Sequence, residues 1–477
     1  MRPRVVRWVM LFTGCLVCAS CTSYEPKPLI PAEIVASVDA SRHMPYGAGE
    51  NANGPAFTLA LAAQWMRDNG PLVKEAVAAY ETALARAKVE TPFPNPALNA
   101  GARWGFGSDV EAVNRLAPFG SIGFSIPLGG RLTRQDELNE AVAEVARVEG
   151  LARHRELYLK LRMRFSELVI ARARERLHEN ISEAARRTVG VARRLVEAGS
   201  ATAVDVSIFE LELARNLAER VHSEQATAAT EAQLSELVGV HADLFSNISE
   251  SPLPVLPENP PTLVELREIL VVHHPRLGRL RATYEAAERS LRLEIAKQYP
   301  DFSFGPSYDA ETGERKTVLG LTLGIELPLF DQNQQAIGEA TKRREEVRVQ
   351  YTSEANRALA ELEGAYRSVQ LSRRRHLVLR EQVLPRAEAS VLIARESLSA
   401  GSGNALSLLE ADRSQREIQV EVLDAELEAR QAWAALEQSV GYPLMTFPSE
   451  IPESAVSPPA GLRLQNDEEA IRVENSK

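Results

Sequence analysis

Cysteine and aromatic residues are scarce in this chain, and each shortage excludes a class of protein. Only three of the 477 residues are cysteines, all at or before position 21, so disulfides cannot hold the rest of the chain together. Aromatic residues make up 6% of the chain, which suits long solvated helices better than one thick globular core. The formal net charge of −10 argues against a protein that binds nucleic acid.

Sequence patterns that carry catalysis are missing too. The chain has no phosphate-binding loop, dinucleotide-binding fingerprint or nucleophile motif. The eight histidines are scattered, and the one adjacent pair, His273 and His274, would point apart on a helix. We therefore expect neither an enzyme nor a protein with a metal or another cofactor.

The first 21 residues have the organisation of an export signal. Three arginines precede the short apolar stretch from Trp8 to Val17, and small residues follow it. The sequence Cys18-Ala19-Ser20-Cys21 resembles a bacterial lipobox, which implies that Cys21 is acylated and becomes the mature N-terminus. An ordinary signal peptide with incidental cysteines is the alternative. Beyond this segment no run of 18 apolar residues occurs, so no helical membrane span is expected.

Two pairs of long helices are predicted from apolar residues that recur at steps of three or four. At about 1.5 Å per residue, a helix over residues 133–198 would reach roughly 100 Å, far more than an ordinary globular core needs. Its partner would return over residues 201–239, and the second pair would span residues 332–400 and 404–441. Glycine and serine lie between the members of each pair, because glycine can end a helix and serine can cap the next one.

The second pair of helices has two further features. Pro385 lies inside its first member and is expected to kink it. Its second member carries a continuous line of apolar residues, which we call the α seam: Ile418, Val422, Ala425, Ala429, Ala432, Leu436 and Val440.

Four short segments change to a period of two, which predicts strands. The first pair lies at residues 102–106 and 122–128, and the second pair at residues 302–305 and 319–327. Apolar residues occupy one face of these segments, and small or polar residues occupy the other. In a water-soluble sandwich the apolar face would form the core. Here the rest of the chain resembles rod-like helix and offers little cover, so we interpret the strands as part of a barrel with lipid outside and water inside.

A barrel built from these strands needs more than one chain. Exposed strand edges in lipid leave backbone groups unpaired, at a cost of several kcal/mol each. Four strands cannot enclose a channel. Several chains must therefore contribute to one barrel.

Residues repeat at a nearly constant offset, which indicates two tandem copies of one unit. Pro71 recurs as Pro275 and Tyr80 as Tyr284, 204 residues later in both cases. The expected organisation is a signal peptide at 1–21, an extended leader at 22–56, a first repeat at 57–239, a linker at 240–261, a second repeat at 262–442 and a disordered tail at 443–477.

The order of these elements resembles the TolC-like outer membrane efflux protein family. The similarity extends to the strand-to-helix junctions SIPLGGRL and ELPLFDQNQ, the hairpin turns EAGSATAVDV and SAGSGNALSLLEADRSQ, and the ending ALEQSVGY. It covers residues 57–442 and both repeats carry it. The resemblance implies a mainly α fold with a small membrane β part. In such a homotrimer the helices form a periplasmic barrel, and four strands from each chain form one shared 12-stranded β-barrel.

The function that the resemblance implies is that of the outer-membrane channel in a tripartite efflux system. Such a channel conducts substrate from an inner-membrane pump and a periplasmic adaptor across the periplasm and the outer membrane. The junctions at Gly129-Gly130 and Asp331-Gln332 are similar to the subgroup that serves heavy-metal pumps of the resistance-nodulation-division type. This similarity makes metal cations a candidate cargo beside drugs and polypeptides, and Arg131, Gln332 and Gln335 depart from the pattern of that subgroup.

The resemblance also assigns roles to residues at the two hairpin turns. Gly199, Ser200, Gly401 and Ser402 lie where members of this family contact the adaptor, and simple helix termination is compatible with that role.

Two acidic residues follow the turns at the place of the family's periplasmic constriction, Asp205 and Glu410. In a symmetric assembly each would form a ring of like charge that attracts cations, and Arg413 is a basic group that could pair with them. A solvated surface carboxylate is the alternative for both.

Two other functions are weighed against the efflux channel. A periplasmic, lipid-anchored coiled-coil scaffold or adaptor would not need four strands with an apolar face. Secretion of polypeptides would use the same duct, so the sequence leaves that alternative open.

Overall fold

The computed structural model describes residues 24–42, 58–106, 116–198, 202–245, 253, 255–257, 259–311, 316–400, 405–445 and 459–462. Residues 1–54 and residues 55–477 form two separate units, and each is described by itself.

The first unit contains one described helix, α2 (Pro31–Ser41), all of whose side chains are exposed. The sequence predicted an extended leader at 22–56, so this prediction is wrong for these eleven residues. Proline stands at the first helical position, where its fixed φ suits a helix and its missing N–H costs no hydrogen bond.

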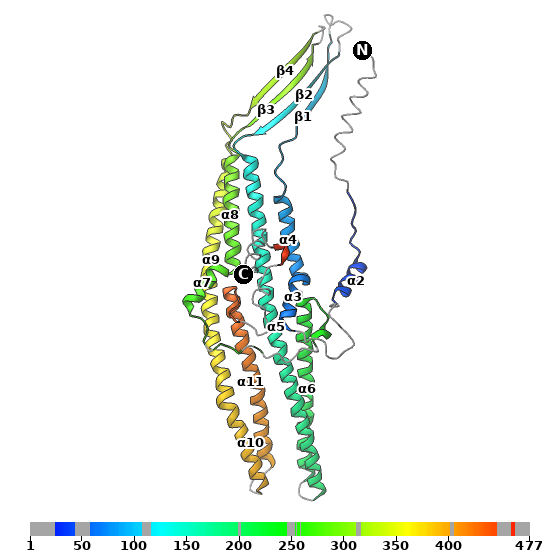
Figure 1. Ribbon diagram of the computed structural model, residues 1–477, viewed down its shortest axis with the longest axis vertical. Coiled ribbons are helices and arrows are strands. Elements are labelled where there is room, and N and C mark those ends of the chain that lie inside the picture. Colours follow the sequence, from blue (N-terminus) through cyan, green and yellow to red (C-terminus); the bar gives the residue numbers. More distant parts are fainter. Residues whose placement is uncertain are drawn as a thin grey trace, which may run out of the picture. The chain divides into compact units, whose positions relative to one another are not determined.

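Long helices dominate the second unit, as the apolar periodicity predicted (Figure 1). The first pair is α5 (Arg131–Glu197) with α6 (Ala203–Val238). In the second pair, α9 (Gln334–Val378) and α10 (Leu384–Ser399) follow one another, and α11 (Ala405–Val440) returns.

A π-helical turn, η3 (Leu379–Val383), joins α9 to α10 just before Pro385. The proline has no N–H to donate to the carbonyl four residues earlier, so an α-helical hydrogen bond is lost at this point. The wider π turn accommodates that loss, and it is the form that the predicted interruption takes.

Short helices pack on the long ones. The short helices are α3 (Leu59–Asn69), α4 (Pro71–Ala87), α7 (Leu263–His273) and α8 (Pro275–Ala296). Two single turns of 3-10 helix also occur among the described residues, η2 (Ala242–Phe245) after α6 and η4 (Ala460–Leu462) in the tail. Helix α4 contacts α5, and α8 contacts both α5 and α9 (Figure 1). Nearer the hairpin turns the contacts run from α6 to α5, from α5 to α11 and from α11 to α10. Each half of the unit is thus a layer of four helices.

Four antiparallel strands form one sheet at the end of the helices away from the hairpin turns (Figure 1). They are β1 (Ala97–Trp104), β2 (Leu116–Pro127), β3 (Asp301–Ala310) and β4 (Thr317–Ile325), in that spatial order. All four predicted strands are confirmed. Strand β1 begins five residues before the predicted start at 102, because it pairs with β2 along its whole length.

The α seam is where the return helix α11 meets the rest of the unit. Its last five residues, from Ala425 to Val440, are buried, whereas Ile418 and Val422 are half-buried. Trp433 lies in the same buried cluster as Leu266 and Leu270 of α7 and Leu362 of α9. Small alanines on α11 allow the helices to approach closely here, so the predicted seam is confirmed as core.

The C-terminal tail is ordered in two places where the sequence predicted disorder. Glu437, buried in α11, accepts hydrogen bonds from the N–H groups of Leu444 and Met445 at 2.7 and 2.8 Å, and it pairs with buried Arg162 of α5 at 3.0 Å. A buried carboxylate needs hydrogen-bond donors, and the backbone of the tail supplies two of them. Further on, Leu462 is fully buried against Gly150, where an added Cβ would lie 2.9 Å from its Cδ2 atom.

His154 makes the stability of the helical layer depend on pH. The pKa of His154 is lowered from 6.5 to about 4, mainly by burial and in addition by the positive charges of Arg67 and Arg155. A group with a lowered pKa contributes stability that is complete above its unfolded pKa of about 6.5 and is lost as the pH falls toward 4. The difference corresponds to about 3 kcal/mol.

We therefore expect acid to destabilise the wild-type chain more than the His154→Gln variant between pH 6.5 and 4. Thermal unfolding in detergent, followed by circular dichroism, measures the difference. The Lys342→Gln variant, which changes an exposed side chain on α9 that does not titrate in this range, is the control and should follow the wild type. Parallel loss of stability in wild type and His154→Gln would contradict the assignment.

Candidate functional site

The register of the sheet sorts its side chains onto two unlike faces. Phe124 of β2 lies opposite Phe304 of β3, which lies opposite Leu323 of β4, so all three side chains share one face. On β1, Leu98 lies opposite Ile122 and joins the same face. Phe124 and Phe304 stack with ring centroids 5.1 Å apart. The predicted alternation therefore produces one continuous apolar face across four strands.

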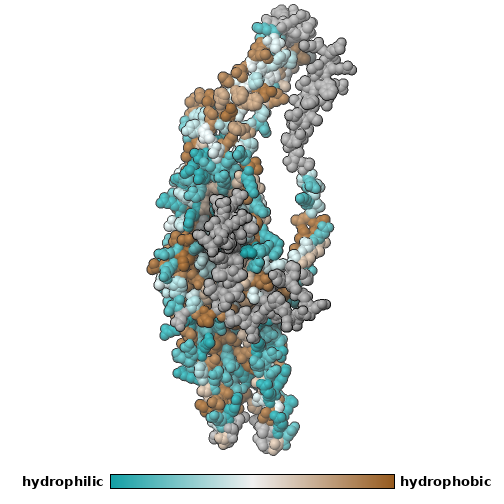
Figure 2. Space-filling model, viewed as in Figure 1, coloured by the Kyte–Doolittle hydropathy of each residue, from teal (hydrophilic) through white to brown (hydrophobic). Residues whose placement is uncertain are grey.

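This apolar face is uncovered in the chain. The exposed fraction is 80% for Leu319, 67% for Leu321 and 63% for Leu323. Figure 2 shows hydrophobic residues gathered over the part of the sheet nearest the helices, whereas most of the helical surface is hydrophilic. An exposed apolar surface of this extent marks a place where a membrane or another protein covers the molecule.

The opposite face is lined mainly by small and polar residues. It carries Ser303, Ser307 and Gly305 on β3, and Thr322 and Gly324 on β4. Asp301, near the helices, pairs with Arg131 at 3.1 Å and is approached by the hydroxyl of Ser125 at 3.4 Å. This face is suited to contact with water.

Both outer strands of the sheet keep one edge without a partner. Among the described residues, β1 pairs only with β2 and β4 pairs only with β3. Each free edge presents unpaired backbone N–H and C=O groups, which readily pair with a strand of another chain.

Apolar side chains also lie exposed along the two outermost long helices. On α6 these include Val204 and Leu211, seven residues apart and 67% and 55% exposed. On α9 the exposed residues Leu371 and Val378 are likewise seven residues apart, and Leu392 is exposed on α10 beyond the π-helical turn. A repeat of seven is the spacing at which one helix packs along another, so both flanks of the helical layer are suited to further helices.

The structure describes only some of the residues to which the sequence assigned roles. Cys21, Gly199, Ser200, Gly401 and Ser402 lie outside the described residues. Asp205 lies in the first turn of α6. Glu410 lies on α11 with its side chain exposed. The prediction that these two acids line one constriction is not tested in a single chain.

Arg416, which the sequence did not single out, joins the two helical hairpins. Its Nη1 atom lies 3.5 Å from Glu212 Oε1 on α6, and its Nη2 donates to Asp412 Oδ2 at 2.8 Å. The side chains of Arg416 and Glu212 are only 16% and 15% exposed. Arg413, the basic group named from the sequence, instead pairs with Glu417 of its own helix at 3.2 Å. The spacing of four residues from Asp412 to Arg416 was a visible signal, but nothing in the sequence pointed to Glu212.

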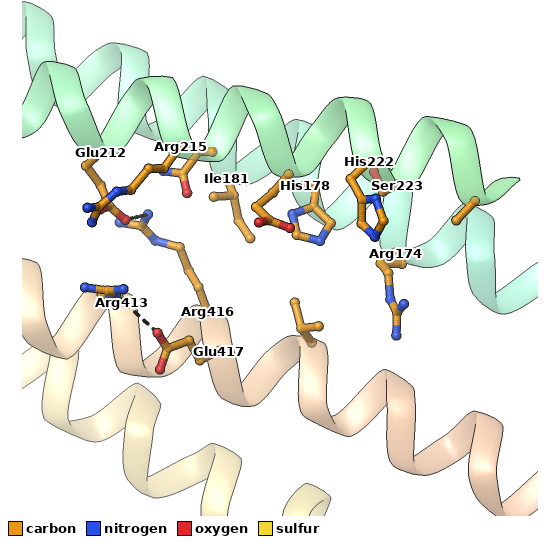
Figure 3. Close-up of a pocket in the computed structure, with 14 residues that line it drawn as sticks. Arg174, His178, Ile181, Glu212, Arg215, His222, Ser223, Arg413, Arg416 and Glu417 are labelled. Carbon is orange, nitrogen blue, oxygen red and sulfur yellow. Dashed lines mark hydrogen bonds and ion pairs between the residues drawn. The ribbon is translucent and has the colours of Figure 1, made fainter.

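A cavity of about 640 Å³ lies between these hairpins, next to Arg416 (Figure 3). His178 of α5 and His222 of α6 line it together with Arg174. Burial lowers the pKa of His178; Glu219 raises it, and Arg174 and His222 lower it. Arg174 also pairs with Asp424 of α11, so a second ion pair crosses from one hairpin to the other. The space between the hairpins is thus polar and bridged by charged pairs.

Two properties of the described residues bear on metal ions and membranes. Among them, no three or more histidine, cysteine, aspartate or glutamate side chains are grouped so as to hold a metal ion. His273 contacts Tyr442 with ring centroids 4.7 Å apart, and His274 caps α8 by accepting the N–H of Leu277. None of the helices in the described part of the chain is both long and apolar enough to cross a membrane.

Comparison of the sequence with a family model and with a known protein gives results that agree. A model of the family described as outer membrane efflux protein matches residues 63–240 and 266–442. The cobalt-zinc-cadmium resistance protein CzcC of Cupriavidus metallidurans is 24% identical over 429 residues, which cover 89% of this chain and 95% of CzcC.

Solved structures show the same fold. A membrane protein from Pseudomonas aeruginosa superposes with a TM-score of 0.66 and 18% identity, over 81% of this chain and 91% of that one. The outer membrane protein VceC from Vibrio cholerae superposes with a TM-score of 0.64 and 18% identity, over 80% of this chain and 96% of VceC.

Proposed function

The chain belongs to the outer membrane efflux protein family, and we propose that three copies form one duct that leads from the periplasm through the outer membrane. The observation that carries this proposal is the sheet, whose apolar face is uncovered and whose two edges are unpaired. Lipid can cover the face, but only other strands can satisfy the edges. Four strands from each of three chains give a closed barrel of twelve strands, which lies within the range of known membrane barrels.

The helical layer supports the same assembly. Its flanks, α6 on one side and α9 with α10 on the other, are different surfaces that each carry exposed apolar residues. Packing of one flank on the other flank of the next copy is a head-to-tail contact, which generates a ring when the rotation closes. In the proposed duct the helices of three chains therefore form a periplasmic tunnel that continues the barrel.

Partners and anchoring follow from this arrangement. We infer that the duct receives cargo from a periplasmic adaptor and an inner-membrane pump, with the adaptor contacting the hairpin turns at Gly199-Ser200 and Gly401-Ser402. Acylation of Cys21 would add an anchor in the outer membrane. Metal cations are the proposed cargo, and the support is the similarity to CzcC, whose name states resistance to cobalt, zinc and cadmium.

The constriction of the duct is proposed at the end where the hairpins turn. Asp205 and Glu410 would each be present three times there and attract cations. The pair of Arg416 and Glu212 holds one hairpin of a chain to the other, so it limits how far the tunnel can open.

Lysine at Leu321 and Leu323 should prevent insertion into the outer membrane, because each cationic side chain near the midplane costs roughly 2–4 kcal/mol. The Thr322→Lys variant places the same charge on the opposite face of β4 and should insert normally. Fractionation of outer membranes measures insertion. Growth of the same cells in cobalt, zinc and cadmium tests whether these metals are the cargo.

Normal insertion of the double lysine variant would contradict the lipid-facing assignment. If cells without any copy of the chain tolerate the three metals as well as wild-type cells do, the metal cargo is wrong while the duct stands.

Replacement of Asp205 and Glu410 by alanine should raise the single-channel conductance in planar bilayers and weaken the preference for cations, because two rings of negative charge are removed. Glu339→Gln, on α9 far from the turns, is the control and should conduct like the wild type. Unchanged conductance and unchanged ion preference in the alanine variant would remove both acids from the constriction.

A further inference from the structure

Three side chains cross the small-residue face of the sheet at the end away from the helices. Arg103 of β1 donates from Nη1 and Nη2 to the two carboxylate oxygens of Asp309 on β3, at 3.1 and 3.0 Å. Between them, on β2, lies Phe119, and the guanidinium carbon of Arg103 is 5.1 Å from the centre of its ring. We name these three residues the clasp, since they join strands β1, β2 and β3.

The residues next to the clasp leave room for its side chains. Phe119 lies directly opposite Gly101 on β1 and Asp309 on β3. A Cβ at Gly101 would lie 2.5 Å from the Phe119 ring, so glycine is required where the ring folds over β1. The ring in turn gives the guanidinium a flat surface on its way to the carboxylate, a favourable cation–π arrangement.

The clasp is the bulkiest feature of its face. Its neighbours on that face are small or short, namely Asn99, Ser121, Ser307, Gly320 and Thr322. Among the described strand residues, Phe119 is the aromatic side chain of this face, and Arg103 and Asp309 carry its charges at this end. The charged side chains remain reachable by solvent, with exposed fractions of 59% for Arg103 and 38% for Asp309.

We propose that the clasp narrows the outer part of the pore and that its ion pair keeps this level of the pore free of net charge. The inference rests on the proposed function, in which this face lines the barrel and every chain contributes one clasp at the same level. The bulk of each clasp restricts the width of the pore. The clasp is neutral as a whole, because the positive charge of Arg103 balances the negative charge of Asp309. Breaking the ion pair leaves one charge without its partner inside the pore, and three chains multiply that charge.

Single-channel recordings of the full-length protein in planar bilayers, with a gradient of potassium chloride, test the proposal. Arg103→Ala leaves Asp309 unpaired, so the reversal potential should shift toward the equilibrium potential of potassium. Asp309→Ala should shift it toward the equilibrium potential of chloride. The double variant Arg103→Ala/Asp309→Ala should show the ion preference of the wild type with a higher conductance, because the pore is wider and no charge is left over.

The exchanged pair Arg103→Asp/Asp309→Arg is the matched control, since it keeps both the charges and the bulk and should restore the behaviour of the wild type. Asp309→Asn keeps the shape of the side chain and should shift ion preference toward chloride even if an alanine variant fails to assemble.

The outcomes separate the inference from the function on which it rests. If wild type conducts and every clasp variant that conducts has the same conductance and reversal potential, the clasp only braces the sheet and the proposal is overturned. A wild-type protein that never conducts would refute the duct itself.

Discussion

Unpaired backbone groups at the two edges of the sheet are the constraint on which the rest of the structure depends. In lipid an unpaired N–H or C=O has no water to bond with, so a sheet exposed to hydrocarbon must close on itself. Four strands ordered from β1 to β4 cannot close alone, yet their apolar face has no cover within the described chain. In the proposed assembly lipid covers this face and strands of further copies pair with both edges, so this member of the outer membrane efflux protein family would meet both requirements in the membrane.

The helical part of the chain is held together by contacts of two kinds. Alanines of the α seam let α11 pack closely on its neighbours, and the buried pair of Arg162 and Glu437 ties α11 to α5. Farther toward the hairpin turns the packing opens into a polar cavity, where Arg416 and Glu212 bridge the hairpins (Figure 3). Close apolar packing fixes the middle of the helical unit, where α11 meets α7 and α9, whereas ion pairs link the part where a duct would have to open.

The sequence was a good guide to elements with a strong period. Long helices, four strands and the α seam were all predicted, since a repeat of 3.6 or 2 residues is a local property that directly reports which face is buried. The leader and the tail were harder. Helix α2 has no buried face to create a period, and the order of the tail depends on Glu437, whose need for donors becomes visible only once α11 and α5 are packed together.

Candidate site residues divide in the same way. The turns and the acids beyond them were located by family resemblance, and most of them lie outside the described residues or have no described side chain. The bridge from Arg416 to Glu212 and the clasp from Arg103 to Asp309 join residues about 200 positions apart, and no local pattern connects such distant positions. Both depend on register between elements, which a single sequence does not determine.

The most direct test of the account is cross-linking of chains through the edges of their sheets. Strands lie about 4.8 Å apart, so β1 and β4 of one chain are roughly 14 Å apart, too far for a disulfide, which needs Cα atoms within about 7 Å. Variants that carry one cysteine on β1 and one on β4 should therefore form covalent dimers and trimers in intact outer membranes, and no larger species. Cysteine pairs that leave every chain monomeric under oxidation, whatever their position along the two strands, would contradict a barrel shared between copies.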